Sequence, residues 1–186
     1  MERRVEELLN TLHSLQFSDA ETVLNELRSL VLSNRLTPAQ TAFCSTKLLN
    51  SEISLLELIK KFRQEQDRLI WKTVTNALNL VSEYITYRSF AVPKYMQDIK
   101  DTCMSLMATS TKSSMVKEAA LKPLIKLIEV FKPAQIQDVL NPIELVRVLL
   151  DGKIKLEEKK LGSTCKRLYS ERRDLSYSGT ACELLP

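Results

Sequence analysis

Glycine is almost missing from this chain. The sequence has 3 glycines in 186 residues, and the first of them is Gly152. Phosphate-binding loops, dinucleotide-binding turns and nucleophile elbows all need glycine where the backbone takes a positive φ or closely approaches a ligand. None of these motifs can be built before Gly152, so most enzyme chemistry on small molecules is excluded there.

Signals for metal ions and membranes are scarce as well. The 4 cysteines are far apart in the sequence and the single histidine is His13, whereas a zinc site needs clustered ligands. No apolar run approaches the roughly 18 to 20 residues that span a bilayer, and the charged start MERRVEELL is not a signal peptide. We expect no metal, no cofactor and no membrane segment, and a soluble intracellular chain with reduced thiols.

No constellation of catalytic residues stands out either. Glu57, Glu65, Asp67 and Glu83 read as isolated surface acids rather than a converging pair, and no nucleophile is paired with a base. Because His13 has no partner base in view, we expect it to be a surface or half-buried structural residue. The sequence therefore argues against an enzyme.

What the chain does contain is the composition of a helical globular protein. It is 44% hydrophobic and 27% charged, and aromatic residues make up only 6%. Strand signals are few because β-branched residues rarely alternate with polar ones. The predicted class is all-α. Apolar stripes at helical spacing predict helices over about residues 1–16, 18–31, 38–50, 51–62, 68–87, 93–107, 114–131 and 142–151, with a weaker one after residue 152.

Capping signals set several of these boundaries. Ser18 with Glu21 predicts a capping box at the second helix, so that the first two helices fold back as an antiparallel pair. Thr37 and Gln40 repeat the signal at the third, with Pro38 at the first helical position. Asn141 and Pro142 give the same pattern further on.

Two residues inside the predicted helices, a proline and the tryptophan, lead to separate predictions. Pro123 lies within the dense apolar pattern of residues 114–131. Since proline removes a helical hydrogen bond and clashes with the preceding turn, we expect a kink or a restart near Leu121. The single tryptophan, Trp71, is expected in the core.

The spacing of the helices predicts an architecture. Consecutive helices joined by short turns, paired about every 35 to 40 residues, are typical of an α-solenoid of HEAT/armadillo-like antiparallel helix pairs. No sequence motif repeats, so a compact helical bundle stays open.

One stretch of the chain is distinctly basic. Lys and Arg outnumber Asp and Glu between Lys153 and Asp174. Such a patch could follow phosphates by releasing counterions, without reading bases. A solvated helix face is the favoured interpretation, because no aromatic side chains accompany the charges. The candidate nucleic-acid-binding residues are Lys153, Lys155, Lys159, Lys160, Lys166 and Arg167.

Three segments resemble a known family. These are NSEISLLELIKKF at Asn50–Phe62, the long segment Ala77–Cys103, and Ala119–Val146. They resemble the extreme N-terminal region of the DNA-dependent protein kinase catalytic subunits (DNA-PKcs), which belong to the phosphatidylinositol 3-kinase-like kinases. IKDTC at Ile99–Cys103 and LIKL at Leu124–Leu127 match most closely. The segments follow in order, but they are structural helices rather than a functional motif.

The resemblance implies a role as well as a fold. In that family the N-terminal solenoid holds a DNA end together with the Ku heterodimer during non-homologous end joining, in the nucleus. The kinase domain lies at the far C-terminus and is not expected here, which agrees with the lack of a glycine-rich loop or catalytic-loop motif. Residues 1–170 would then be an N-terminal helical-repeat segment.

The last residues depart from this pattern. Residues 171–186 lack helical periodicity, where the family would continue with further repeats. We expect an irregular tail that comes from a truncated form or an incomplete gene model. The alternative to the whole resemblance is an unrelated helical-repeat adaptor that binds a partner peptide.

Overall fold

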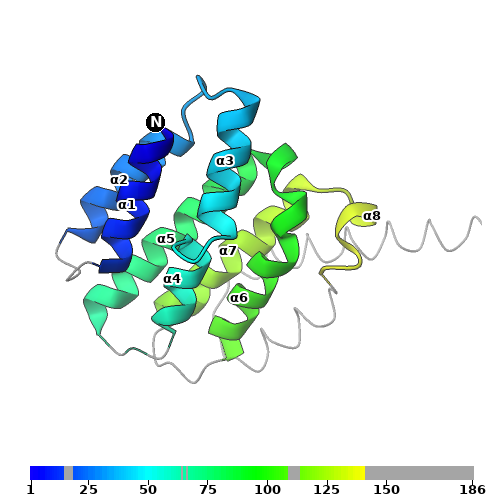
Figure 1. Ribbon diagram of the computed structural model, residues 1–186. Helices are drawn as coiled ribbons and strands as arrows, with labels where there is room; N and C mark the ends of the chain where they lie inside the picture. The colour runs from blue at the N-terminus through cyan, green and yellow to red at the C-terminus, as the bar shows by residue number, and fades with distance from the viewer. Residues whose placement is uncertain (15–18, 64, 66, 109–113, 141–186) are drawn as a thin grey trace, which may run out of the picture.

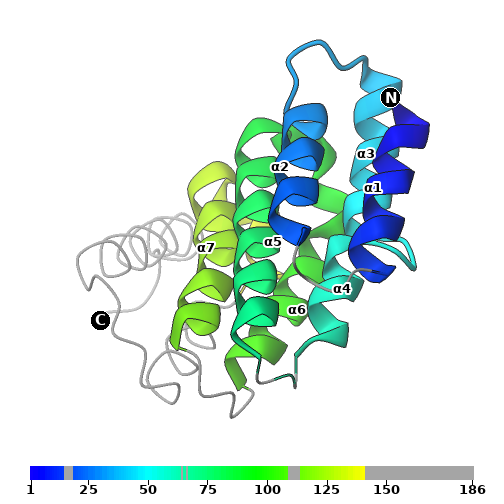
Figure 2. The same ribbon diagram turned by 90° about the vertical axis from the view of Figure 1, so that its left-hand side faces the viewer.

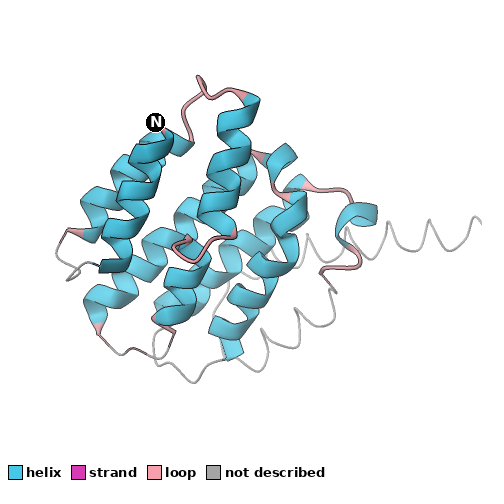
Figure 3. Ribbon diagram, viewed as in Figure 1, coloured by secondary structure: helices cyan, strands magenta, loops and turns pink. Residues whose placement is uncertain are grey.

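The computed structural model describes residues 1–14, 19–63, 65, 67–108 and 114–140. All regular elements within these ranges are helices (Figure 3), which confirms the predicted all-α class. The helix predicted at Asn141 and Pro142, the basic run and the tail lie outside the described residues. In chain order the elements are α1 (Glu2–Ser14), α2 (Ala20–Val31), α3 (Pro38–Leu49), α4 (Leu55–Lys61), α5 (Arg68–Tyr87), η1 (Ser89–Ala91), η2 (Pro93–Tyr95), α6 (Met96–Ala108), α7 (Ser114–Val130) and α8 (Pro133–Ile136).

The capping box predicted at the start of α3 is confirmed. At α3 the Thr37 hydroxyl accepts a hydrogen bond from the Gln40 amide at 3.2 Å, and the Gln40 side chain accepts one from the Thr37 amide at 3.0 Å. The N-cap of α2 is Asp19, which makes no side-chain cap bond. Ser18, on which the capping box was predicted, lies outside the described residues.

The helices form two layers (Figures 1 and 2). One layer holds α2, α5 and α7 side by side, and the other holds α1, α3, α4 and α6. α5 lies in the middle of its layer, where it packs against α2 and α7 and against α4 of the other layer. α1 and α2 run antiparallel, as the short connection between them predicts.

A single hydrophobic core joins the two layers. It extends from Val5 on α1 to Leu140 after α8 without a break into separate clusters. α5 contributes to it along its whole length, and Leu78 at its centre is 0% exposed. Tyr84 near the end of α5 is the largest of the fully buried side chains.

α7 runs through its proline. The helix is continuous over Ser114–Val130 with Pro123 inside it, so the restart predicted near Leu121 does not occur. Leu121, Pro123 and Leu124 are all buried. Burial of this face between α5 and α6 outweighs the loss of one helical hydrogen bond, that to the Ala119 carbonyl.

The tryptophan and the histidine both lie at the edge of the core. Trp71 is half-buried and its indole N–H donates to the Glu65 carbonyl at 2.9 Å. Trp71 thus packs against the core, as predicted, but at its edge, because the indole N–H finds its acceptor in an exposed segment. His13 is half-buried as expected, with Nε2 at 3.0 Å from the Ser54 carbonyl.

Within the described part of the chain, no helix is both long and apolar enough to cross a membrane.

Candidate interaction surfaces

The structure leaves the predicted basic residues unplaced. Lys153, Lys155, Lys159, Lys160, Lys166 and Arg167 all lie outside the described residues. Two grooves are lined by described residues, one on each helical layer.

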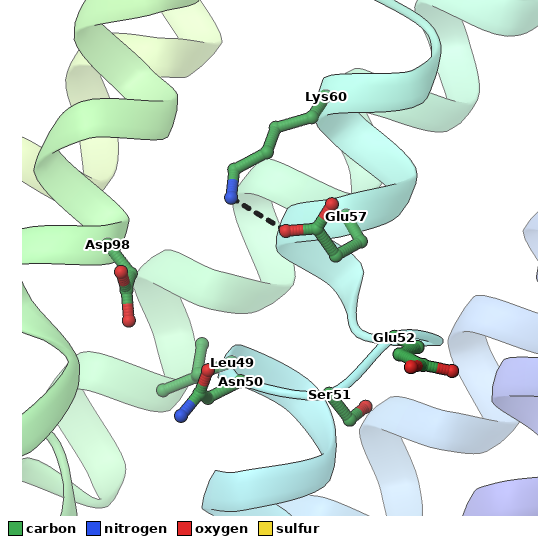
Figure 4. A pocket seen from close by; sticks show the side chains of 7 residues that line it. All are labelled: Leu49, Asn50, Ser51, Glu52, Glu57, Lys60 and Asp98. Atoms are coloured by element: carbon green, nitrogen blue, oxygen red, sulfur yellow. Dashed lines mark hydrogen bonds and ion pairs between the residues drawn. The ribbon is translucent and has the colours of Figure 1, made fainter.

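The α3–α4 groove lies beside the turn that connects the end of α3 to the start of α4. α3 ends at its C-cap Asn50, and α4 starts after Ser54, whose hydroxyl accepts from the Glu57 amide at 3.2 Å. The turn between them leaves a hollow of about 500 Å³ that α6 closes from the side with Asp98 (Figure 4). The groove is lined by Leu49, Asn50, Ser51, Glu52, Glu57, Lys60 and Asp98.

This groove has a negative balance. Lys60 forms an ion pair with Glu57 at 2.7 Å, which leaves the carboxylates of Glu52 and Asp98 to set the charge. Figure 4 shows the three carboxylates spread around the hollow rather than converging on one point. In agreement with that spacing, the residues that the structure describes hold no group of three or more ligating side chains suited to a metal ion.

The α2–α5 groove lies on the opposite layer. It measures about 410 Å³ and is lined by Arg28, Leu32, Asn34, Glu83 and Tyr87. Arg28 of α2 and Glu83 of α5 form an ion pair of 2.6 Å beside it. A second pair, Glu21 with Lys72 at 2.5 Å, joins the same helices nearer their starts, so α2 and α5 run parallel.

Arg88, the C-cap residue of α5, joins that helix to the end of α2. Its guanidinium donates to the carbonyls of Val31, the last residue of α2, and of Ser33 just beyond it. Carbonyls at a helix end lack helical partners and carry the negative end of the helix dipole. Arg88 therefore satisfies these groups and fixes the C-terminal end of α5 against that of α2.

The buried titratable groups are structural. Burial raises the pKa of the Cys44 thiol to about 11 and that of the Tyr84 hydroxyl to about 12, and it raises the pKa of the Cys103 thiol further still. A reactive cysteine instead needs a lowered pKa and solvent access. Neither thiol is suited to act as a nucleophile.

Sequence reasoning missed the partners of the acidic residues. From the sequence we expect Glu57 and Glu83 to be isolated, yet each forms an ion pair: Glu57 with Lys60, and Glu83 with Arg28. Asp67 caps α5 by accepting from the Leu69 amide at 2.6 Å. The i, i+3 spacing of Glu57 and Lys60 could have revealed the first pair. Arg28 and Glu83 are 55 positions apart, so no local signal could have revealed theirs.

Comparison with known proteins identifies the family. The family model described as "DNA-PKcs, N-terminal" matches residues 42–169, which is more than half of the chain. The chain belongs to the DNA-PKcs N-terminal family. The resemblance seen in the three sequence segments is thus confirmed, and the DNA-PKcs match covers the N-terminal, non-kinase region. No curated protein and no solved structure matches the chain.

Proposed function

We propose that this chain is a non-catalytic scaffold of the DNA-PKcs type, acting in repair of DNA double-strand breaks by non-homologous end joining. Its partners would be the Ku heterodimer and double-stranded DNA ends, and its compartment the nucleus. The observation that carries the proposal is the family match over residues 42–169. Family membership also removes the alternative of an unrelated helical-repeat adaptor.

The arrangement of helices supports the scaffold role. We take α1 with α2, α3–α4 with α5, and α6 with α7 as three successive antiparallel pairs of a HEAT/armadillo-like solenoid. In such an array each pair packs mainly on its neighbours. The contacts of α5 with α2 on one side and α7 on the other fit this pattern.

DNA contact is assigned to the basic run. The residues proposed for it are Lys153, Lys155, Lys159, Lys160, Lys166 and Arg167. Lysine and arginine bind phosphates without reading base edges, so binding would be independent of sequence and steeply weakened by salt.

A charge-reversal experiment tests this assignment. Binding of the chain to a fluorescent blunt-ended hairpin duplex is measured by anisotropy at two salt concentrations, with and without Ku. The variant with Lys159, Lys160, Lys166 and Arg167 changed to Glu should lose binding because its phosphate contacts become repulsive.

The matched control carries the same change of charge on α7 and at the residue before α8. It replaces four lysines of that region, and circular dichroism verifies that both variants remain helical. The control should bind as the parent does. Undiminished duplex binding by the first variant would contradict the assignment. The control positions are Lys117, Lys122, Lys126 and Lys132.

A further inference from the structure

The two exposed aromatic side chains of the described residues lie three positions apart. Tyr87, the last residue of α5, is 61% exposed and Phe90, in η1, is 68% exposed. The other described aromatic residues are buried or packed partly against the core. Tyr87 also lines the α2–α5 groove. Aromatic area is thus concentrated at one end of the α2–α5 pair.

The backbone beneath these side chains is firmly held. The Arg88 amide donates to the Tyr84 carbonyl at 2.8 Å, and the Ala91 amide to the Arg88 carbonyl at 2.9 Å. The Arg88 side chain binds the end of α2, and Val92 is 0% exposed in the core. Both exposed side chains therefore belong to a firmly held turn, so little backbone entropy is lost when a flat ligand packs on them.

The surroundings of the pair are basic. Arg28 lines the groove, Arg35 directly follows the lining residue Asn34, and Lys94 lies in η2, with its ammonium over the Tyr95 ring. Arg35 is exposed and makes no ion pair with other described residues. Glu83 is the one acid that lines the groove, and Arg28 neutralises it.

Arg88 makes this end acceptable to an anion. The C-terminal ends of α2 and α5 meet here, and their free carbonyls would otherwise repel phosphate. By donating to the carbonyls of Val31 and Ser33, the Arg88 guanidinium offsets that negative end. Exposed aromatic faces beside a positive surface are the combination that holds single strands, through stacked bases and neutralised phosphates.

We propose that this surface binds a single-stranded nucleic-acid segment. Bases stack on Tyr87 and Phe90, while Arg35 and Lys94 contact the phosphates. The inference rests on the proposed function, because a single-stranded extension at a broken DNA end is the segment that would reach this surface. An apolar peptide fits less well, because Arg35 and Lys94 would lose hydration without gaining a partner.

Binding of a fluorescent oligothymidylate to the 186-residue chain tests the proposal. Anisotropy at low salt should show binding, and Phe90→Ala and Tyr87→Ala should each raise the dissociation constant by about tenfold. Arg35→Glu should weaken binding and reduce its dependence on salt. The matched control is Leu69→Ala, which removes a side chain that is 57% exposed at the other end of α5 and should change nothing.

A second measurement locates the contact directly. Photo-crosslinking of a bromodeoxyuridine oligonucleotide, followed by mass spectrometry, should label the peptide that holds Tyr87 and Phe90. Equal binding by Phe90→Ala and the parent, or labelling elsewhere, would overturn the proposal and leave a protein partner as the occupant. Blunt-duplex binding with Ku should be unchanged in Phe90→Ala, so this inference can fail while the proposed function stands.

Discussion

Tyr84 holds its hydroxyl group inside the core. The oxygen lies 2.7 Å from the Ser45 hydroxyl and donates to the Thr41 carbonyl at 3.2 Å. These contacts join α5 to α3, and burial keeps the hydroxyl protonated by raising its pKa to about 12. The side chain is therefore both a packing element and a polar link between the layers.

Removal of this hydroxyl should destabilise the protein. Tyr84→Phe should lower the free energy of unfolding by about 1 to 2 kcal/mol, because a buried hydrogen bond is lost. Tyr87→Phe is the control, since that hydroxyl belongs to a side chain that is 61% exposed. Urea denaturation followed by circular dichroism measures both, and equal stability of the two variants would contradict the assigned role.

The same residue predicts a dependence on alkaline pH. The pKa of Tyr84 is raised in the folded state from an unfolded value of about 10. Its protonated form therefore stabilises the fold fully below pH 10, and this contribution falls as the pH rises through about 12. Tyr84→Phe should lose less stability than the parent between these two pH values in parallel urea denaturations. Identical pH profiles would count against a buried Tyr84.

The two described cysteines should resist alkylation. Cys44 and Cys103 are both 0% exposed, and burial raises the pKa of each thiol, so little thiolate forms at pH 8. Treatment of the native protein with iodoacetamide, followed by peptide mass spectrometry, should leave both unmodified. The same treatment in urea should label them. Rapid labelling in native buffer would mean that this part of the core opens readily.

At the scale of elements, the capping box of α3 can be tested against a helix that lacks one. Thr37→Ala should cost about 1 kcal/mol of stability, because the Gln40 amide loses its acceptor. Asp19→Ala at the start of α2 should cost less, since the Asp19 side chain makes no cap bond. Chemical denaturation of both variants gives the comparison. A larger loss of stability in Asp19→Ala than in Thr37→Ala would contradict the finding that, of these two helix starts, only that of α3 is capped by a side chain.

Helix positions could be predicted because their signals are local. The apolar stripe over residues 68–87 and the proline at position 38 each gave a boundary that the structure confirms. The restart predicted near Leu121 does not occur, because the cost of Pro123 is local, whereas the burial of Leu121 and Leu124 that outweighs it comes from other helices. The periodicity of the sequence cannot show whether the burial energy exceeds the cost of the proline.

At the scale of the molecule, α5 is the element on which the two layers depend. Leu78→Ala at its centre should lower the free energy of unfolding by about 2 to 5 kcal/mol, because it opens a cavity beneath both neighbours. Leu69→Ala on the same helix should change it by about 0.5 kcal/mol or less. Urea denaturation measures the pair. A comparable effect at both positions would mean that α5 is not central to the core.

The layers themselves were harder to foresee than the helices. The antiparallel first pair followed from a short connection, but the contact of α2 with α5 joins residues more than 50 positions apart, as in Lys72 with Glu21. Both grooves arise from such contacts. Asp98 reaches the α3–α4 groove from α6, and Glu83 of α5 pairs with Arg28 of α2, 55 positions earlier. A single sequence holds no signal for contacts between residues so far apart in the chain.

The continuous core also bears on where this protein can be cut. The family match begins at residue 42, inside α3, yet Val5, Leu9 and Leu27 pack into the same core as the matched helices. His13 and Lys61 further bind α1 to both ends of α4. A recombinant fragment trimmed to the matched boundary would expose the sides of α3 and α5 that α1 and α2 cover, and would aggregate. The unit that folds is therefore longer than the unit that sequence comparison recognises.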